Sequence, residues 1–327
     1  MKPRQALLVL LLIGLSPLLH AQAKTRAEAP KGTALAGSIS LWNSKPSDRD
    51  FDLAIIGGPV AGKGWVKSEG AKALLEKGDR LSLYALEAGE IGTATLTSGG
   101  ALDSEKPPDG GESWGLGFKA RLTIPEARKA PYEKAHKLRQ TDFDNYVDLP
   151  VLAAWTRDGS KPQWVSGELL VGQRAKESTY WEAAADWLRT KGVPQKDIDG
   201  MQIKQVVRAD INRDGRHEIF ISLGCAATWG YRQEDLKASG YDDETASRVF
   251  YSYLLIRRLR PGSEQVETLI LDDEPWRSLY VCGFCDLDRD GTAEVIVSGS
   301  GIDWSGSMLY HWDGKRFQAV EGWGGGC

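Results

Sequence analysis

Histidine is scarce in this chain of 327 residues, which contains four. Three of them, His136, His217 and His311, lie beyond residue 23, and no two have the spacing of zinc ligands. A zinc site and a Ser-His-Asp triad therefore lack support. Basic runs are also lacking, and the formal net charge is −4. A mildly acidic chain without a basic patch has no electrostatic basis for binding nucleic acid.

Long apolar runs are rare as well, and the N-terminal one has the features of a signal peptide. Lys2 and Arg4 precede the apolar run Ala6–Leu19, and Ala21-Gln22-Ala23 follows it with small residues that suit signal peptidase. The run is too short for a membrane span, and no Cys at the cleavage site offers a lipid anchor. Residues 1–23 are therefore predicted to be a cleavable signal peptide, and residues 24–38 a flexible leader. We expect a periplasmic or extracellular protein without stable membrane insertion.

Cysteine is limited to four residues, all in the C-terminal third: Cys225, Cys282, Cys285 and Cys327. An even number in an exported chain predicts disulfides, with three possible connectivities. Cys282 and Cys285 have C-x-x-C spacing, which could be redox-active, but they lie on a predicted strand. Residues i and i+3 of a strand point to opposite faces, so we expect both to be bridged to Cys225 and Cys327, with the pairing open.

Short β-type runs separated by Gly, Pro and charged turns fill the first half of the chain. They lie at 51–56, 80–86, 90–97, 115–123 and 147–155. Residues 39–165 are therefore predicted to form a small, β-rich N-terminal domain. Residues 166–327 form the second predicted domain.

One amphipathic helix is predicted at the start of the second domain. Trp181, Ala184, Ala185 and Leu188 recur at helical spacing. Thr179 and Glu182 have the spacing of a capping box, and Gly192 and Pro194 end the helix. We expect its apolar face to pack against a sheet.

After this helix the chain repeats itself. Residues 206–225 align without gaps to residues 282–301, an offset of 76 residues. Further strands are predicted after each copy, at 251–257, 265–271, 308–312 and 316–320, and a helical insertion at 233–247. Repetition at this scale predicts stacked units of similar structure.

Each copy contains an acidic loop of the form acid-x-[Asn/Asp]-x-Asp-Gly-x-x-Glu. Calcium prefers six to eight oxygen ligands in a flexible shell, and the glycine permits the positive φ needed to turn around an ion. An acidic β-turn is the alternative, but carboxylates packed this closely repel one another without a cation. The candidate ligands, with a backbone carbonyl at Arg216 and Thr292, are Asp210, Asn212, Asp214, Arg216 and Glu218 in the first loop, and Asp286, Asp288, Asp290, Thr292 and Glu294 in the second.

The two loops differ in charge. The second offers four carboxylates and the first three, because Asn212 replaces an acid. Arg213 and Arg289 occupy equivalent places and cancel from this comparison. Since ligand charge tunes the affinity of such loops, the second loop is predicted to be the tighter site.

Both segments resemble FG-GAP-type repeats (integrin-α-like, VCBS-like), whose blades carry a hairpin calcium loop of this form. The resemblance implies two FG-GAP-like β blades with calcium as the cofactor. With the β-type runs and the helix described above, the expected fold is mainly β (α+β): a small N-terminal β domain followed by the two blades with one packed helix. A closed β-propeller is the alternative fold. It needs about four blades, and residues 48–53 and 142–149 are candidates for decayed copies.

The composition and the loops together favour an exported, calcium-stabilised binding or scaffold protein without catalytic activity. Its ligand is expected to be a protein or a glycan. The twelve tryptophans leave one alternative open, a secreted polysaccharide hydrolase or lyase that uses carboxylates in a Trp-lined cleft.

Overall fold

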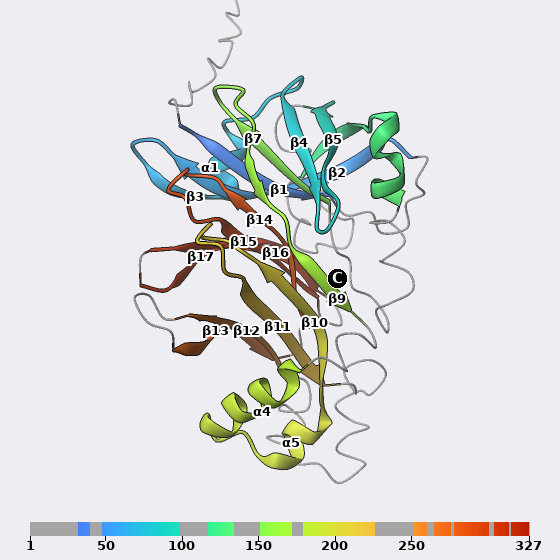
Figure 1. Cartoon of the computed structure of the whole chain (residues 1–327). Helices are drawn as coiled ribbons and strands as arrows, with labels where there is room; N and C mark the ends of the chain where they lie inside the picture. The colour runs from blue at the N-terminus through green and yellow to red at the C-terminus, as the bar shows by residue number, and fades with distance from the viewer. Residues whose placement is uncertain are drawn as a thin grey trace, which may run out of the picture.

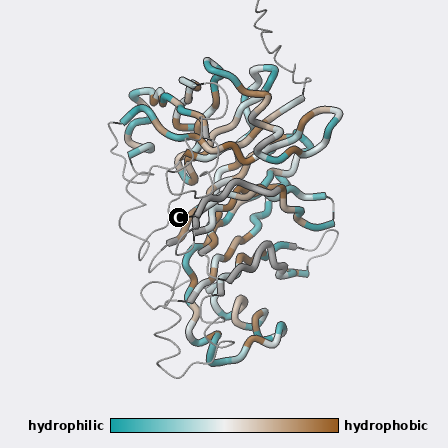
Figure 2. Tube along the Cα trace, turned by 180° about the vertical axis from the view of Figure 1, so that it is seen from behind, coloured by the Kyte–Doolittle hydropathy of each residue, from teal (hydrophilic) through white to brown (hydrophobic). Residues whose placement is uncertain are grey.

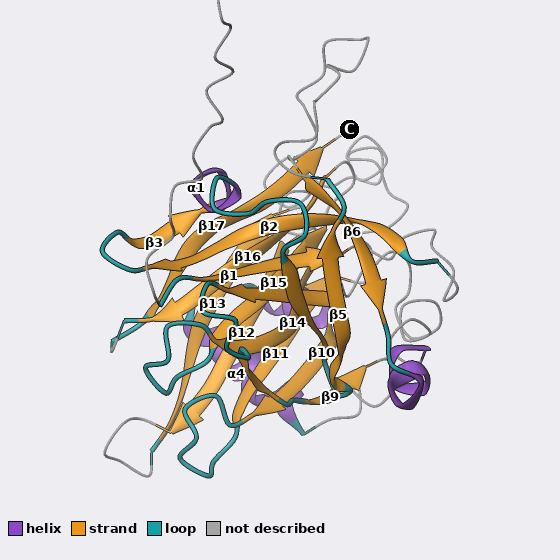
Figure 3. Cartoon of the chain, turned by 90° about the horizontal axis from the view of Figure 1, so that it is seen from above, coloured by secondary structure: helices purple, strands orange, loops and turns teal. Residues whose placement is uncertain are grey.

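A computed structural model describes residues 32–39, 48–98, 117–133, 151–171, 179–225, 251–259, 265–275, 278–300, 304–313 and 315–326. The predicted signal peptide, the predicted insertion at 233–247, residues 142–149 and Cys327 lie outside the described residues. The fold is mainly β, as the sequence predicts, and Figure 3 shows how strongly strands predominate. None of the helices in the described part of the chain has the length and apolarity to cross a membrane.

Six strands of the N-terminal region form a closed antiparallel barrel. Their order is β1-β7-β4-β5-β6-β2, and β1 pairs with β2 to close the ring. β3 extends the sheet from β2, and the short helix α1 (Ser68–Lys72) follows β3. The strand bounds are Ala34–Ile39 (β1), Asp50–Val60 (β2), Gly64–Lys67 (β3), Arg80–Ala85 (β4), Gly89–Leu96 (β5), Gly117–Thr123 (β6) and Val151–Thr156 (β7).

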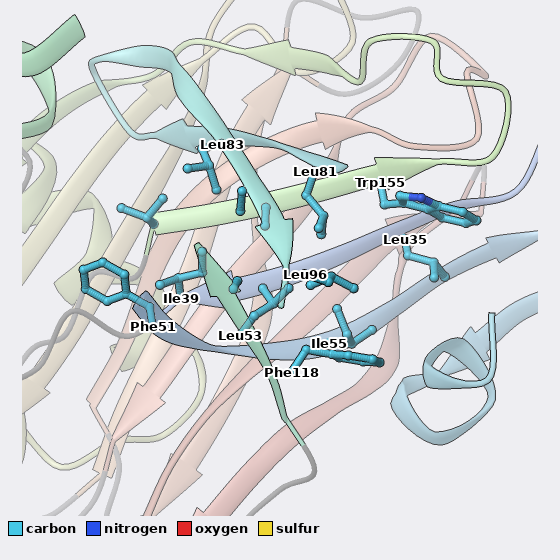
Figure 4. Packing of buried hydrophobic residues seen from close by; sticks show 14 of the residues in the cluster. Leu35, Ile39, Phe51, Leu53, Ile55, Leu81, Leu83, Leu96, Phe118 and Trp155 are labelled. Atoms are coloured by element: carbon cyan, nitrogen blue, oxygen red, sulfur yellow. The ribbon is translucent and has the colours of Figure 1, made fainter. Parts of the chain in front are cut away.

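Alternating side chains of these strands fill the barrel. Figure 4 shows Leu35, Leu53, Leu83, Leu96 and Phe118 pointing into a shared core, and all five are fully buried. Period-2 alternation places one face of every strand inside a small barrel, where side chains fill the interior. The five strands predicted from β-type runs in this region are confirmed.

The prediction of a flexible leader over residues 24–38 is wrong at its C-terminal end. Residues 34–39 form β1, a wholly buried strand between β2 and β7. Its small residues carry little strand signal, yet the packing requires them. A Cβ on Gly37 would lie 2.7 Å from the Ala54 carbonyl oxygen, at the point where the β1–β2 register shifts.

The repeated region forms two five-stranded antiparallel sheets. The first sheet has the order β13-β12-β11-β10-β9 and the second β17-β16-β15-β14-β8. In the first sheet the strands are Glu168–Val171 (β9), Met201–Ala209 (β10), Glu218–Cys225 (β11), Tyr251–Leu259 (β12) and Val266–Pro275 (β13). In the second they are Gln163–Val165 (β8), Ser278–Asp286 (β14), Glu294–Ser300 (β15), Trp304–Trp312 (β16) and Phe317–Gly326 (β17).

The predicted domain boundary at residue 165 is corrected by β8. This strand falls inside the predicted N-terminal domain, but it pairs with β14 of the second sheet. The barrel therefore ends with β7 at Thr156. The described strands form one barrel and two blade-like sheets, and they do not form the ring of a closed propeller.

The described residues form a stack of layers, and four clusters of their apolar side chains hold the layers together. Figure 1 shows the barrel, the second sheet, the first sheet and the helices α4 (Tyr180–Thr190) and α5 (Gln195–Gly200) in that order. One cluster fills the barrel, one joins the barrel to the second sheet, one joins the two sheets, and one joins the first sheet to the helices. The apolar tint of the central strands, with polar turns around them, follows this arrangement (Figure 2).

The two sheets stack head to tail. Ile203 and Ile221 of the first sheet face the helices, whereas their counterparts 76 residues later, Leu279 and Val297, face the first sheet. On the opposite face, Phe220 packs against the second sheet, whereas its counterpart Ile296 packs against the barrel. Each unit therefore turns the same face toward the next layer of the stack.

A buried glutamine fixes the sheets relative to each other. Gln205 donates from Nε2 to the Val281 carbonyl at 2.9 Å and accepts from the Val281 N–H at 2.8 Å. Its side chain thus pairs with the free edge of β14 as another strand would. Ser222 donates to the neighbouring Leu279 carbonyl. Buried polar groups with complete hydrogen bonding specify one arrangement of a core.

The predicted helix is confirmed, but its predicted capping box is wrong. Ala184, Ala185 and Leu188 are buried against the first sheet. Thr179 makes no side-chain cap hydrogen bond, because it adopts φ −69° and ψ −1°, inside the helical region. A capping hydroxyl needs extended backbone to reach the N–H groups of the first turn.

The prediction that Cys282 and Cys285 form disulfides is also wrong. Both carry thiols and are buried, and Cys282 Sγ donates to the Tyr280 carbonyl at 3.6 Å. A β-bulge between Val281 and Gly283 shifts the alternation, so both thiols face the cluster between barrel and second sheet. The side chain of Cys225 and all of Cys327 lie outside the described residues.

Candidate metal centre

The two acidic loops have the same backbone path. Each joins two paired strands, β10 to β11 and β14 to β15. Arg213 and Gly215 in the first loop have φ 57° and 85°, and Arg289 and Gly291 in the second have φ 63° and 96°. These left-handed positions let the chain turn back within a few residues.

The glutamate that ends each loop is buried and closes it. Glu218 Oε2 accepts from the Ile211 N–H at 3.1 Å, and Glu294 Oε2 accepts from the Leu287 N–H at 2.7 Å. The two side chains therefore occupy the same structural position in their units. The other oxygen of Glu218, Oε1, accepts from Nδ2 of Asn212 at 3.3 Å.

In the second loop three carboxylates converge. One oxygen from each of Asp286, Asp288 and Glu294 lies within 4.8 Å of the other two. Asp286 and Glu294 are buried, at 3% and 2% exposure. Oδ1 of Asp286 is also buried and has no hydrogen-bond partner among the described residues. An unpaired buried carboxylate oxygen among other carboxylates is the arrangement that a bound cation relieves.

The electrostatics of the second loop agree with this geometry. Burial, and then the neighbouring Asp288 and Asp286 carboxylates, raise the pKa of Glu294 to about 9, although the Leu287 N–H opposes the shift. Burial likewise raises the pKa of Asp286, against the lowering effect of Arg213. The folded chain therefore disfavours the full set of negative charges unless a positive charge joins them.

The first loop resolves the same crowding with an amide. Asn212 Nδ2 donates to Asp214 at 3.2 Å and to Glu218 at 3.3 Å. The two oxygens of Asp210 accept from the N–H groups of Asp214 and Gly215 at 3.0 and 2.9 Å. Burial raises the pKa of Glu218 to about 7, a smaller shift than that of Glu294. A neutral donor thus lies between the carboxylates of this loop.

Not all predicted ligands take part in the convergence. Asp290 lies outside the group of three, and its Oδ1 accepts from the Thr292 N–H at 2.7 Å. Asp214 does the same for Arg216 at 2.9 Å. These two aspartates shape the turn of each loop through a hydrogen bond to the backbone.

The prediction that Arg213 and Arg289 have equivalent surroundings is wrong. Arg213 of the first loop lies 3.5 Å from Asp286 of the second, whereas Arg289 lies 4.0 Å from Asp158 after β7. These contacts depend on how the two sheets stack, and a local sequence pattern does not predict that arrangement. The one available signal was an arginine at the same loop position in both copies.

The barrel supports the second loop from one side. β8 places Gln163 opposite Asp286, and Tyr84 of the barrel donates to the β8 carbonyl of Val165 at 2.6 Å. Trp164 stacks on Tyr84 with 4.5 Å between ring centroids. Trp155 is buried in the barrel. These tryptophans therefore serve packing.

Comparison of the chain with protein-family models, with curated proteins and with solved structures finds no match.

Proposed function

We propose that this chain is an exported binding or scaffold protein of the FG-GAP type, stabilised by calcium at its second loop. The observation that carries the proposal is the buried Oδ1 of Asp286, which has no hydrogen-bond partner among the described residues while two further carboxylates converge beside it. Asp286, Asp288 and Glu294 would hold the ion.

Calcium is the cation that this donor set suits best. Three carboxylates on one nine-residue loop match its preference for many oxygen ligands, with backbone carbonyl and water completing the shell. Magnesium demands a near-octahedral shell, keeps several waters and is usually bound by one or two carboxylates. A soft metal would require the thiols, but burial raises the pKa of Cys285 well above its usual range.

Calorimetric titration of the mature protein with calcium tests the site. Asp286→Asn should abolish the tighter binding event, because it removes the charge of a buried ligand. Asp210→Asn is the matched control, since Asp210 holds the same position in the first loop and its carboxylate accepts from the N–H groups of Asp214 and Gly215. This control should keep the tighter event. Equal losses in both variants, or none, would contradict the assignment.

Two further measurements address the remaining parts of the proposal. N-terminal sequencing of the protein secreted by an expressing bacterium should begin at Lys24, and an intact N-terminus would exclude a cleaved signal. Glycan and envelope-protein arrays, probed in calcium and in chelator, should show binding that depends on calcium. Turnover of a polysaccharide instead would favour the alternative of a hydrolase or lyase.

A further inference from the structure

Two arginines at the same position of the two loops contact different partners. Arg213 Nη2 lies 3.5 Å from Oδ2 of Asp286, one of the three converging carboxylates. Arg289 lies 4.0 Å from Asp158 and donates to Ser160, both in the turn that follows β7. Each arginine reaches from its own unit to the next layer of the stack. Of these two arginines, Arg213 is the one that contacts a candidate metal ligand.

The first loop holds Arg213 in place without help from the second. The residue has φ 57°, and the next peptide N–H, that of Asp214, donates to Asp210 and Asn212 at 3.0 and 3.1 Å. The backbone that carries the guanidinium is thus fixed by the first loop itself. The side chain is 44% exposed, whereas that of Asp286 is 2% exposed.

The two oxygens of Asp286 have different surroundings. Oδ2 faces Arg213, and the buried Oδ1 has no hydrogen-bond partner among the described residues. A cation can therefore bind at Oδ1 while the guanidinium stays at Oδ2. Both positive charges would then share one carboxylate and lie about 6 Å apart, a separation estimated from ordinary contact distances.

We propose that Arg213 of the first loop weakens cation binding at the second loop, so that the two loops act as one electrostatic unit. This inference rests on the proposed function, because it requires a cation at Asp286. Repulsion between a unit charge and a divalent ion about 6 Å apart amounts to about tenfold in affinity even at the dielectric constant of water. By thermodynamic linkage, a cation bound at the second loop weakens the ion pair between Arg213 and Asp286 by the same factor.

Calcium titration of the mature protein and four variants tests the proposal. Arg213→Gln removes the charge, and Arg213→Lys keeps it without the planar fork. Arg289→Gln removes the equivalent charge, which is held by Asp158 and Ser160. Asp286→Asn reports whether the site itself exists. Circular dichroism melting of each variant establishes that it is folded.

The expected result is about tenfold tighter calcium binding in Arg213→Gln, with Arg213→Lys and Arg289→Gln within about threefold of the unmodified protein. The gain should shrink when the salt concentration rises from about 0.05 to about 0.5 M, because salt screens the repulsion. Unchanged or weaker binding in Arg213→Gln, with the event still lost in Asp286→Asn, would overturn the inference and leave the metal site standing. Retention of the event in Asp286→Asn would overturn the site and the inference with it.

Discussion

Replacing Glu294 with glutamine should stabilise the metal-free protein and remove its response to calcium. Glu294 is buried and accepts from the Leu287 N–H, which the glutamine carbonyl can still do. Its new amide group would face Asp286 and Asp288, whose oxygens converge with those of Glu294 within 4.8 Å. The first loop already contains such a solution, since the Asn212 amide donates to Asp214 and Glu218.

The size of the effect follows from the ionisation of Glu294. Its pKa is about 9 in the folded chain, against a reference value of 4.5. At pH 8 the unfolded chain gains the free energy of ionisation and the folded chain does not. At about 1.4 kcal/mol per pKa unit this lowers the free energy of unfolding by about 2–5 kcal/mol, the lower value allowing for water that reaches the loop. A glutamine at this position does not ionise, so the free energy of unfolding of the variant is not lowered in this way.

Thermal unfolding at pH 8, in chelator and in calcium, measures both halves of the prediction. In chelator, Glu294→Gln should raise the melting temperature by about 3 °C or more, since an unfolding entropy of about 2 cal/mol/K per residue makes about 1 kcal/mol worth about 1.5 °C in a chain of about 300 residues. In calcium at a hundredfold excess over its dissociation constant, the unmodified protein should gain about 2.7 kcal/mol. The variant should gain little, because it has lost a charged ligand.

The equivalent change in the first loop is the control. Glu218 already accepts a hydrogen bond from the Asn212 amide. Glu218→Gln would place a second amide donor opposite this one, and the variant should not be more stable than the unmodified protein. A lower melting temperature for Glu294→Gln in chelator would refute the electrostatic reasoning. So would a calcium response of this variant equal to that of the unmodified protein.

Three further predictions follow from pKa shifts, burial and hydrogen bonds. Between about pH 4.5 and pH 9, Glu294 keeps its proton in the folded chain and releases it in the unfolded chain. The free energy of unfolding in chelator should therefore fall as the pH rises through this window. Urea titrations at pH 5 and pH 8 should measure this fall, and the fall should be smaller in calcium. Cys282 and Cys285 are buried thiols, so mass spectrometry should find both alkylated in unreduced, denatured protein and neither in native protein; a disulfide at either would contradict this. Gln205→Leu leaves the N–H and carbonyl of Val281 unpaired between the sheets, so urea unfolding should show a loss of about 2–3 kcal/mol, whereas Gln202→Leu on the same strand should change little.

The parts of the fold that the sequence predicts are those encoded locally. The helix from Tyr180, the repeated strands and both loop turns carry their own period or turn residues. Strand β1 does not, because Ala34–Ile39 consists largely of small residues whose value lies in close packing against β2. The three-residue strand β8 is too short to show alternation. Closure of the barrel likewise depends on a pairing between strands far apart in the sequence, β1 with β7.

The candidate site divides in the same way. Asp286, Asp288 and Glu294 were predicted as ligands from spacing alone, and the structure brings these three together. The secondary role of Asp290 could not be predicted, because it depends on which direction the side chain takes within the turn. The contact of Arg213 with Asp286 depends on how one sheet lies on the other. Spacing within a repeat contains no information about that relation.

The head-to-tail stacking has a consequence for how many units such a molecule can hold. A contact between two different faces of like units has a polarity, and nothing in the contact itself limits its repetition. The limit comes from the ends: helices α4 and α5 cover the outer face of the first sheet, and the barrel covers the outer face of the second. A further unit could be inserted between sheet and barrel with its own Arg-to-acid link to the next layer. The length of this stack is therefore set by its two covers, the helices at one end and the barrel at the other.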